Sequence, residues 1–274
     1  MVGYPSGVTA MSMLGRMVCD WSVVSFVLLA FAITWIAFIP FYQAGGEDIA
    51  WFTFGPFVAA IVSSAFLGGW PRLRALLASV VQWRVPPVWY LVAIGMPVAV
   101  QLLAIWLNPM FGSAPPNWAN VPAVTEIAVM VALLLVFSGP LGEEPGWRGF
   151  ALPLLLGERG ALNASLVLGL IWAAWHLPLV LLNDYSISSA LNVMAAAVVF
   201  TWLYQNSAGS VLPAILMHAS HQNSVRYLGR VFEGGDAAQH QWIGLILWLV
   251  FALAIVAVYG TSSFRRRQAT TVAG

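Results

Sequence analysis

Hydrophobic residues occur along this chain in long runs that are separated by short polar segments. A helix needs about 20 apolar residues to cross the hydrocarbon core of a bilayer. Eight runs come close to that length: 21–42, 51–69, 87–107, 122–141, 161–182, 189–206, 211–228 and 241–261. The pattern therefore predicts an all-α, polytopic membrane protein with about eight transmembrane helices and any active site inside the bundle.

One further apolar stretch, "PRLRALLASVVQWRVP" at 71–86, has arginines near both ends and is too short to span a bilayer. We predict an interfacial helix there. Without internal repeats, the chain is expected to form one transmembrane domain over 21–262, preceded by a segment at 1–20 and followed by a basic tail at 263–274. The run from Trp21 is too long for the apolar region of a signal peptide, so we expect a retained first span.

Composition supports the bilayer as the solvent of this protein. Hydrophobic residues make up 61% of the chain and charged residues only 8%, whereas soluble domains carry about 25% charged residues. The net charge of +1 gives no indication of a nucleic-acid partner. The single cysteine, Cys19, cannot form an internal disulfide.

The arginines, which supply all eleven basic residues, predict the orientation. Cytoplasmic loops of membrane proteins carry an excess of basic residues. With both termini in the cytoplasm, that side receives Arg16, Arg72, Arg74, Arg84, Arg159 and Arg265–Arg267. The segments 43–50 and 108–121 then face outward.

Charged side chains are rare in such a chain, and "GEEPGWRGF" at 142–150 holds three of them. On a helix, Glu144 and Arg148 share a face because they are four residues apart, whereas Glu143 points about 100° away. We predict that Arg148 pairs with Glu144 and that Glu143 faces a cavity, where a free carboxylate suits a general base. The alternative is an ion pair at a helix end with no further role. Pro140 and Pro145 are expected to interrupt the helix.

Histidines supply the other polar groups within the predicted spans. His176 lies in the middle of 161–182 and could orient a water molecule, bind a metal or serve as a hydrogen-bonded core residue. In "MHASHQN", His218 and Gln222 are four residues apart and share a helix face, so together they could donate hydrogen bonds to an oxyanion. Asn223 points well around that helix, and we expect His221 to be an interior polar residue.

These motifs resemble those of the CPBP family, which comprises CAAX proteases and bacteriocin-processing enzymes related to type II CAAX prenyl endopeptidases. "EEPGWRG" resembles the EExxxR signature. "WAAWH" resembles FxxxH, with Trp172 in the aromatic position, and "HASHQ" resembles HxxxN or HxxxD, with Gln222 in place of the Asn or Asp. The three motifs occur in the family order and cover roughly 120–225.

The resemblance implies a role for each motif residue. Glu143 would activate water with help from His176, while Glu144 and Arg148 hold the site together. His218, with Gln222 or Asn223, would stabilise the oxyanion. We expect no required cofactor because the HExxH zinc motif is absent, although Glu143, His176 and His218 could together hold zinc.

The expected function is therefore that of an intramembrane endopeptidase acting on a peptide or protein substrate at the membrane, in the plasma membrane of a bacterium. Two alternatives remain. One is a non-catalytic immunity or scaffold protein of the same fold, which the Gln222 departure favours. The other is a proton-coupled transporter, against which the lack of internal repeats argues.

Overall fold

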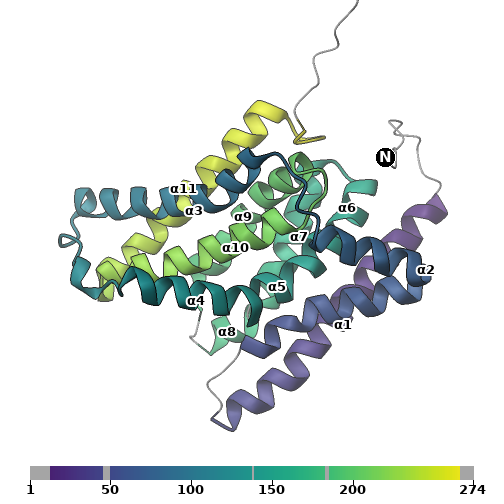
Figure 1. Ribbon diagram of the computed structural model, residues 1–274, viewed down its shortest axis with the longest axis horizontal. Coiled ribbons are helices and arrows are strands. Elements are labelled where there is room, and N and C mark those ends of the chain that lie inside the picture. Colours follow the sequence, from purple (N-terminus) through teal and green to yellow (C-terminus); the bar gives the residue numbers. More distant parts are fainter. Residues whose placement is uncertain (1–12, 46–49, 138, 183–184, 266–274) are drawn as a thin grey trace, which may run out of the picture.

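The computed structural model describes residues 13–45, 50–137, 139–182 and 185–265, and these form helices joined by short loops, with no strand among them (Figure 1). The five long helices are α1 (Met13–Gln43), α2 (Gly55–Val80), α3 (Pro87–Leu107), α9 (Ile187–Asn206) and α11 (Gly234–Tyr259). Within the described part of the chain, five helices are long and apolar enough to cross a membrane, and they correspond to α1, α2, α3, α9 and α11.

The remaining elements are shorter. The α-helices are α4 (Val124–Phe137), α5 (Gly139–Glu144), α6 (Leu152–Glu158), α7 (Ala161–Trp175), α8 (Leu177–Leu181) and α10 (Leu212–Asn223). Two segments are π-helical, η4 (Pro145–Ala151) and η5 (Ser224–Leu228). The 3₁₀ turns are η1 (Ala50–Phe54), η2 (Asn108–Phe111), η3 (Trp118–Asn120) and η6 (Gly229–Val231).

The predicted all-α, polytopic fold is confirmed, but two of the eight predicted spans change along their length. Span 161–182 becomes α7 and α8, and span 211–228 becomes α10, which passes directly into the π-helical η5. Span 122–141 covers α4 and the start of α5, on either side of residue 138, which lies outside the described residues. α7 and α8 meet at His176, two residues before Pro178. A proline cannot continue the helical hydrogen-bond ladder, and its ring clashes with the preceding turn.

A sharp kink divides α2 at Gly69, where φ is 58° and ψ is −154°. Such a conformation is readily available only to glycine, and Pro71 follows it. The predicted span 51–69 and the predicted interfacial helix 71–86 meet at this kink, and the second helix ends at Val80. That the second helix lies along the membrane surface remains a prediction.

α9 lies at the centre of the bundle. It packs against α7 and α11, while α10 packs against α3, α4 and α5. The paired helices α1 and α2 lie at one side of the molecule and contact η4, and α3 and α11 lie at the other (Figure 1). In the apolar stretch of α9, 61% of the residues are buried, whereas the share is 28% in the corresponding stretches of α1 and α11. The two outer pairs therefore expose most of their surface, and the centre of the bundle can hold polar groups away from lipid.

Large apolar side chains are exposed on the long helices, including Ile36, Phe66, Leu91, Leu253 and Val258. Soluble monomers rarely expose contiguous apolar surface on this scale. Together with the five candidate spans, this exposure identifies an integral membrane protein.

Two boundaries differ from those expected. α11 begins at Gly234, seven residues before the predicted span 241–261, and Oδ2 of Asp236 in its first turn accepts a hydrogen bond from the amide of Ala114. The predicted tail begins inside the fold, because Phe264 is fully buried and its carbonyl binds Asn206. Residues 1–12 and 266–274 lie outside the described ranges.

Candidate active site

The three motifs lie where a helix ends or changes from α to π geometry. Glu143 and Glu144 end α5, directly before the π-helical η4, and His176 separates α7 from α8. His218 lies in α10, which continues into the π-helical η5. π-Helical turns occur frequently at functional sites, and irregular backbone within a membrane protein is tolerated where it lines a cavity or is buried in protein. The breaks thus gather the polar groups in the interior.

Glu144 holds two of the motifs together. Its carboxylate lies 3.0 Å from Nη1 of Arg148, so the pair predicted from the four-residue spacing forms. The same oxygen, Oε1, lies 2.7 Å from Nδ1 of His218, on a helix 74 residues away in sequence. Glu144 and Arg148 are both fully buried. This carboxylate therefore fixes the orientation of the His218 ring as well as neutralising the arginine.

Arg148 is enclosed by aromatic rings. Its guanidinium lies 4.0 Å from the ring centroid of Trp172 and 4.4 Å from that of Phe200. Among the described residues, its Nε and Nη2 have no hydrogen-bond partner. Aromatic faces attract cations, and the attraction is stronger where both are desolvated. The burial of Arg148 supports the predicted architectural role, which remains a prediction.

Glu143 is held differently from Glu144. It is 3% exposed, and its Oε2 accepts a hydrogen bond of 2.6 Å from the indole N–H of Trp172. Its Oε1 lies against Gly139: a Cβ added at Gly139 would lie 2.7 Å from Oε1 and 3.5 Å from Nε2 of His218. Oε1 of Glu143 and Nε2 of His218 therefore both lie close to Gly139.

The contact between His218 and Glu144 constrains the protons on the imidazole. The oxygen of Glu144 that contacts Nδ1 of His218 also accepts a hydrogen bond from Arg148, so the network assigns Nδ1 as the donor in this contact. A neutral ring then has a lone pair on Nε2, and Nε2 can donate only when the ring carries both protons. This assignment follows from the hydrogen-bond network rather than from observed hydrogens.

His176 reaches the same region through Trp172. Its Nδ1 lies 2.9 Å from the Trp172 carbonyl oxygen, and its ring stacks on Tyr185 with centroids 4.8 Å apart and planes 14° apart. No hydrogen bond within the described ranges joins His176 to Glu143. Tyr185 was not expected at the site, because it lies in a polar loop and belongs to no motif.

In the third motif, the side chains of Gln222 and Asn223 have different hydrogen-bond partners. α10 is α-helical through Asn223, so no bulge rotates Asn223 onto the face of His218. Nδ2 of Asn223 donates to the Ala219 carbonyl of its own helix at 2.7 Å. Oε1 of Gln222 is buried without a hydrogen-bond partner in the described structure. His221 contacts Nδ2 of Asn192 at 3.1 Å, as expected of an interior polar residue.

The arrangement does not form a metal centre from the residues considered for zinc. Within the described ranges, no three His, Cys, Asp or Glu side chains converge as ligands would. Nδ1 of His176 contacts the Trp172 carbonyl and Nδ1 of His218 contacts Glu144, so Nε2 is the remaining nitrogen of each ring.

Glycines in the first motif allow close packing against the N-terminal part of the chain. A Cβ at Gly142 would lie 2.6 Å from the backbone oxygen of Thr53, and one at Gly146 would lie 2.5 Å from that of Pro56. Real Cβ atoms do not approach backbone atoms so closely. The motif thus needs glycine at these positions to let η1 and the start of α2 press against α5 and η4.

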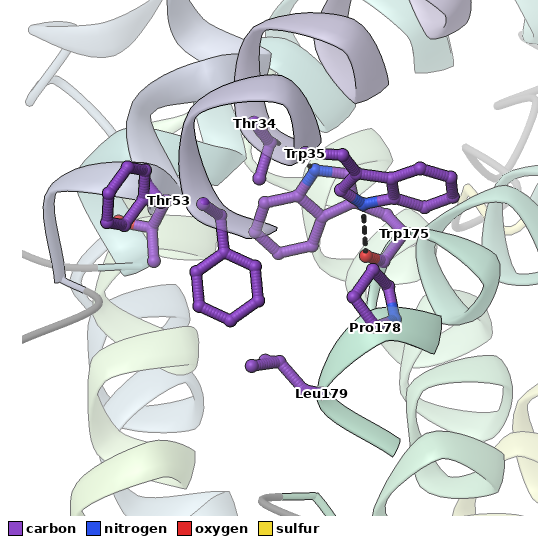
Figure 2. A pocket seen from close by; sticks show the side chains of 8 residues that line it. Thr34, Trp35, Thr53, Trp175, Pro178 and Leu179 are labelled. Atoms are coloured by element: carbon purple, nitrogen blue, oxygen red, sulfur yellow. Dashed lines mark hydrogen bonds between the residues drawn. The ribbon is translucent and has the colours of Figure 1, made fainter. Parts of the chain in front are cut away.

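A small apolar recess borders this region (Figure 2). Figure 2 shows the indole of Trp35 bonded to the Trp175 carbonyl, at 3.1 Å, beside Pro178 and Leu179. The recess is completed by Thr34, Phe38, Phe52 and Thr53. It approaches the site through Trp175, the residue before His176. None of the charged motif residues lines it, so it is separate from the space beside Gly139.

Comparison with known proteins agrees with the motifs. Residues 125–223 match the family model described as type II CAAX prenyl endopeptidase Rce1-like. The matched segment contains all three motifs. Residues 125–223 of this chain are thus similar to that family of endopeptidases. The resemblance inferred from the sequence is thereby confirmed.

One curated relative agrees with this assignment. The chain is 27% identical over 135 residues to CAAX prenyl protease 2 of Methanococcus maripaludis. The alignment covers 44% of this chain and 49% of the relative. The match thus spans about half the length of that protein.

Proposed function

We propose that this CAAX-protease-like protein is an intramembrane endopeptidase in which Glu143 activates the attacking water. The observation that carries the proposal is that Oε1 of Glu143 and Nε2 of His218 both lie close to Gly139, at 2.7 Å and 3.5 Å from the position of an added Cβ. Hydrolysis of an amide requires a general base and a hydrogen-bonding group that can act on the same reacting atoms.

The proposed reaction conserves every proton. Glu143 takes a proton from water as the water oxygen bonds to the peptide carbonyl carbon. The charge that develops on the carbonyl oxygen is met by His218 and Gln222. The C–N bond then breaks while Glu143 returns the proton to the leaving nitrogen. Because Nδ1 of His218 already donates to Glu144, this ring must carry both protons to donate through Nε2.

The other motif residues support this centre. Glu144 and Arg148 hold His218 and the π-helical turn in place. His176, fixed by the Trp172 carbonyl and the Tyr185 ring, is assigned to help Glu143 orient the water. The substrate is a peptide or protein segment at the membrane, because the site lies in the interior of a bundle with lipid-exposed outer helices.

The test uses purified full-length protein in detergent or nanodiscs with a library of fluorogenic peptides. Wild type should cleave a subset of the peptides, and Glu143→Gln should cleave none while remaining folded. Glu126→Gln is the matched control, because Glu126 is an exposed carboxylate on α4 with no proposed role. Cleavage by Glu143→Gln at the wild-type rate would refute the mechanism. Cleavage of no peptide by wild type would favour the non-catalytic alternative.

A further inference from the structure

One side chain, Trp172, contacts all three motifs. Its indole N–H donates to Glu143 and its ring face carries the guanidinium of Arg148 at 4.0 Å. Its backbone carbonyl accepts from His176 at 2.9 Å, and its ring meets that of His218 edge to face at 5.6 Å. Trp172 is 3% exposed. These contacts join α5, η4, α7 and α10 at a single buried residue.

The contact with Glu143 depends on the indole and not on aromaticity alone. A phenylalanine at position 172 could support Arg148 and His218 through its ring, but it would have no N–H to donate. The hydrogen bond of 2.6 Å joins a buried donor to a buried carboxylate. Hydrogen bonds to charged groups are stronger than those between neutral groups, and solvent does not compete at a buried position.

The geometry of Glu143 shows what this bond controls. A carboxylate has two equivalent oxygens that exchange when the side chain rotates. Here Oε2 accepts the hydrogen bond from Trp172, while Oε1 lies beside Gly139, and Nε2 of His218 also lies close to that glycine. Gly139 leaves room for this conformation, because a Cβ there would lie 2.7 Å from Oε1.

We propose that Trp172 is a positioning residue, whose indole N–H fixes Oε2 of Glu143 so that Oε1 alone is presented to the water. This inference rests on the proposed function of Glu143. It adds that the chain depends on tryptophan, rather than on any aromatic residue, at the first position of "WAAWH". In this role Trp172 acts through Glu143.

The first arm of the test separates the indole N–H from the ring. Trp172→Phe should lower kcat about 10- to 100-fold, the loss that corresponds to one hydrogen bond to a charged group. KM should stay close to that of wild type, because Glu143 acts on the water and not on substrate binding. A matched control is Trp175→Phe, which also removes a buried indole N–H, here bonded to Thr34 at 3.1 Å. It should keep kcat near wild type.

The second arm measures the hydrogen bond without an activity assay. In protein labelled with ¹⁵N-tryptophan, the indole N–H resonance of Trp172 is identified by its loss in Trp172→Phe. Glu143→Gln should shift this resonance more than that of Trp175, because a neutral amide replaces the charged acceptor of Trp172 alone.

The two ideas fail in different ways. If wild type and every variant cleave no peptide, the proposed function fails, and the resonance still shows whether the bond exists. If wild type is active and Trp172→Phe keeps its kcat, the positioning role is refuted. An unmoved Trp172 resonance in Glu143→Gln, or an equal loss of kcat in Trp175→Phe, also refutes it.

Discussion

Nδ1 of His218 and Oε1 of Glu144 lie 2.7 Å apart, and that same oxygen accepts a hydrogen bond from Arg148. The second glutamate of the first motif is therefore the link between two helices that the sequence separates by 74 residues. Its neighbour Glu143 contacts Trp172 instead. The two adjacent carboxylates thus have different partners, and they should respond differently to substitution.

Glu144→Gln should lower the free energy of unfolding by about 3–5 kcal/mol, the cost of leaving one member of a buried ion pair without its partner. Activity should fall with it, because His218 loses its anchor. Thermal unfolding in detergent, measured beside peptide cleavage, tests this. Glu143→Gln should instead lose activity and keep its melting temperature. If Glu143→Gln melts early and Glu144→Gln remains stable, then Glu143 is the structural carboxylate and Glu144 the catalytic one.

The double substitution Glu144→Gln with Arg148→Met should recover stability better than activity. It removes the unpaired buried charge and leaves a long apolar side chain against Trp172 and Phe200, but it does not restore the carboxylate that orients His218. Unfolding and cleavage assays on the same preparations measure the two recoveries. Equal recovery of both would show that Glu144 serves only to neutralise Arg148.

Gln222→Ala should reduce kcat by about 10²–10³, the usual cost of removing one oxyanion donor. Asn223→Ala should change kcat little, because Nδ2 of Asn223 donates to its own helix at Ala219. Steady-state kinetics of the two variants form a matched pair on adjacent residues. A large effect confined to Asn223→Ala would mean that the helix turns differently when substrate is bound.

Gly146→Ala should lower the free energy of unfolding by about 1–3 kcal/mol or more, the range for overpacking, because the new Cβ would lie 2.5 Å from the backbone oxygen of Pro56. Gly95→Ala is the control, since a Cβ there meets nothing within 4 Å and alanine favours a helix interior by about 1 kcal/mol over glycine. Thermal unfolding of both variants measures the difference. Equal stability would refute the close packing of α2 on η4.

A strong chelator should leave most of the activity intact, and the purified protein should carry less than one metal ion per chain. This expectation rests on the lack of a compact ligand motif and on the placement of Glu143, His176 and His218. Elemental analysis and cleavage assays before and after chelation test it. Stoichiometric zinc, with activity lost on its removal and restored on its return, would overturn the prediction.

Reporter fusions after Arg84 and Arg159 should give a cytoplasmic signal, and fusions within 43–50 and 108–121 should give an external one. The reason is the excess of arginines on one side of the predicted spans. A cytoplasmic signal from 108–121 would contradict the predicted orientation.

The sequence alone determined the features that depend on residues close together along the chain. Apolar runs identified the five long helices, and the predicted span 87–107 coincides with α3. The four-residue spacing of Glu144 and Arg148 predicted their ion pair, because residues four apart meet on a helix face. The predicted boundary between span 51–69 and the interfacial helix 71–86 coincides with the kink in α2 at Gly69.

Only the tertiary structure decided which polar groups meet. Nothing local in the sequence indicates that His218 binds Glu144 or that Trp172 binds Glu143, because these contacts depend on how separate helices pack. The π-helical turns η4 and η5 could not be predicted either, because a change from α- to π-helical hydrogen bonds does not alter the spacing of apolar residues in a recognisable way. The spans 161–182 and 211–228, which carry the second and third motifs, both depart from a regular α-helix along their length. A buried polar site needs backbone and side-chain partners that a regular, lipid-facing helix cannot supply.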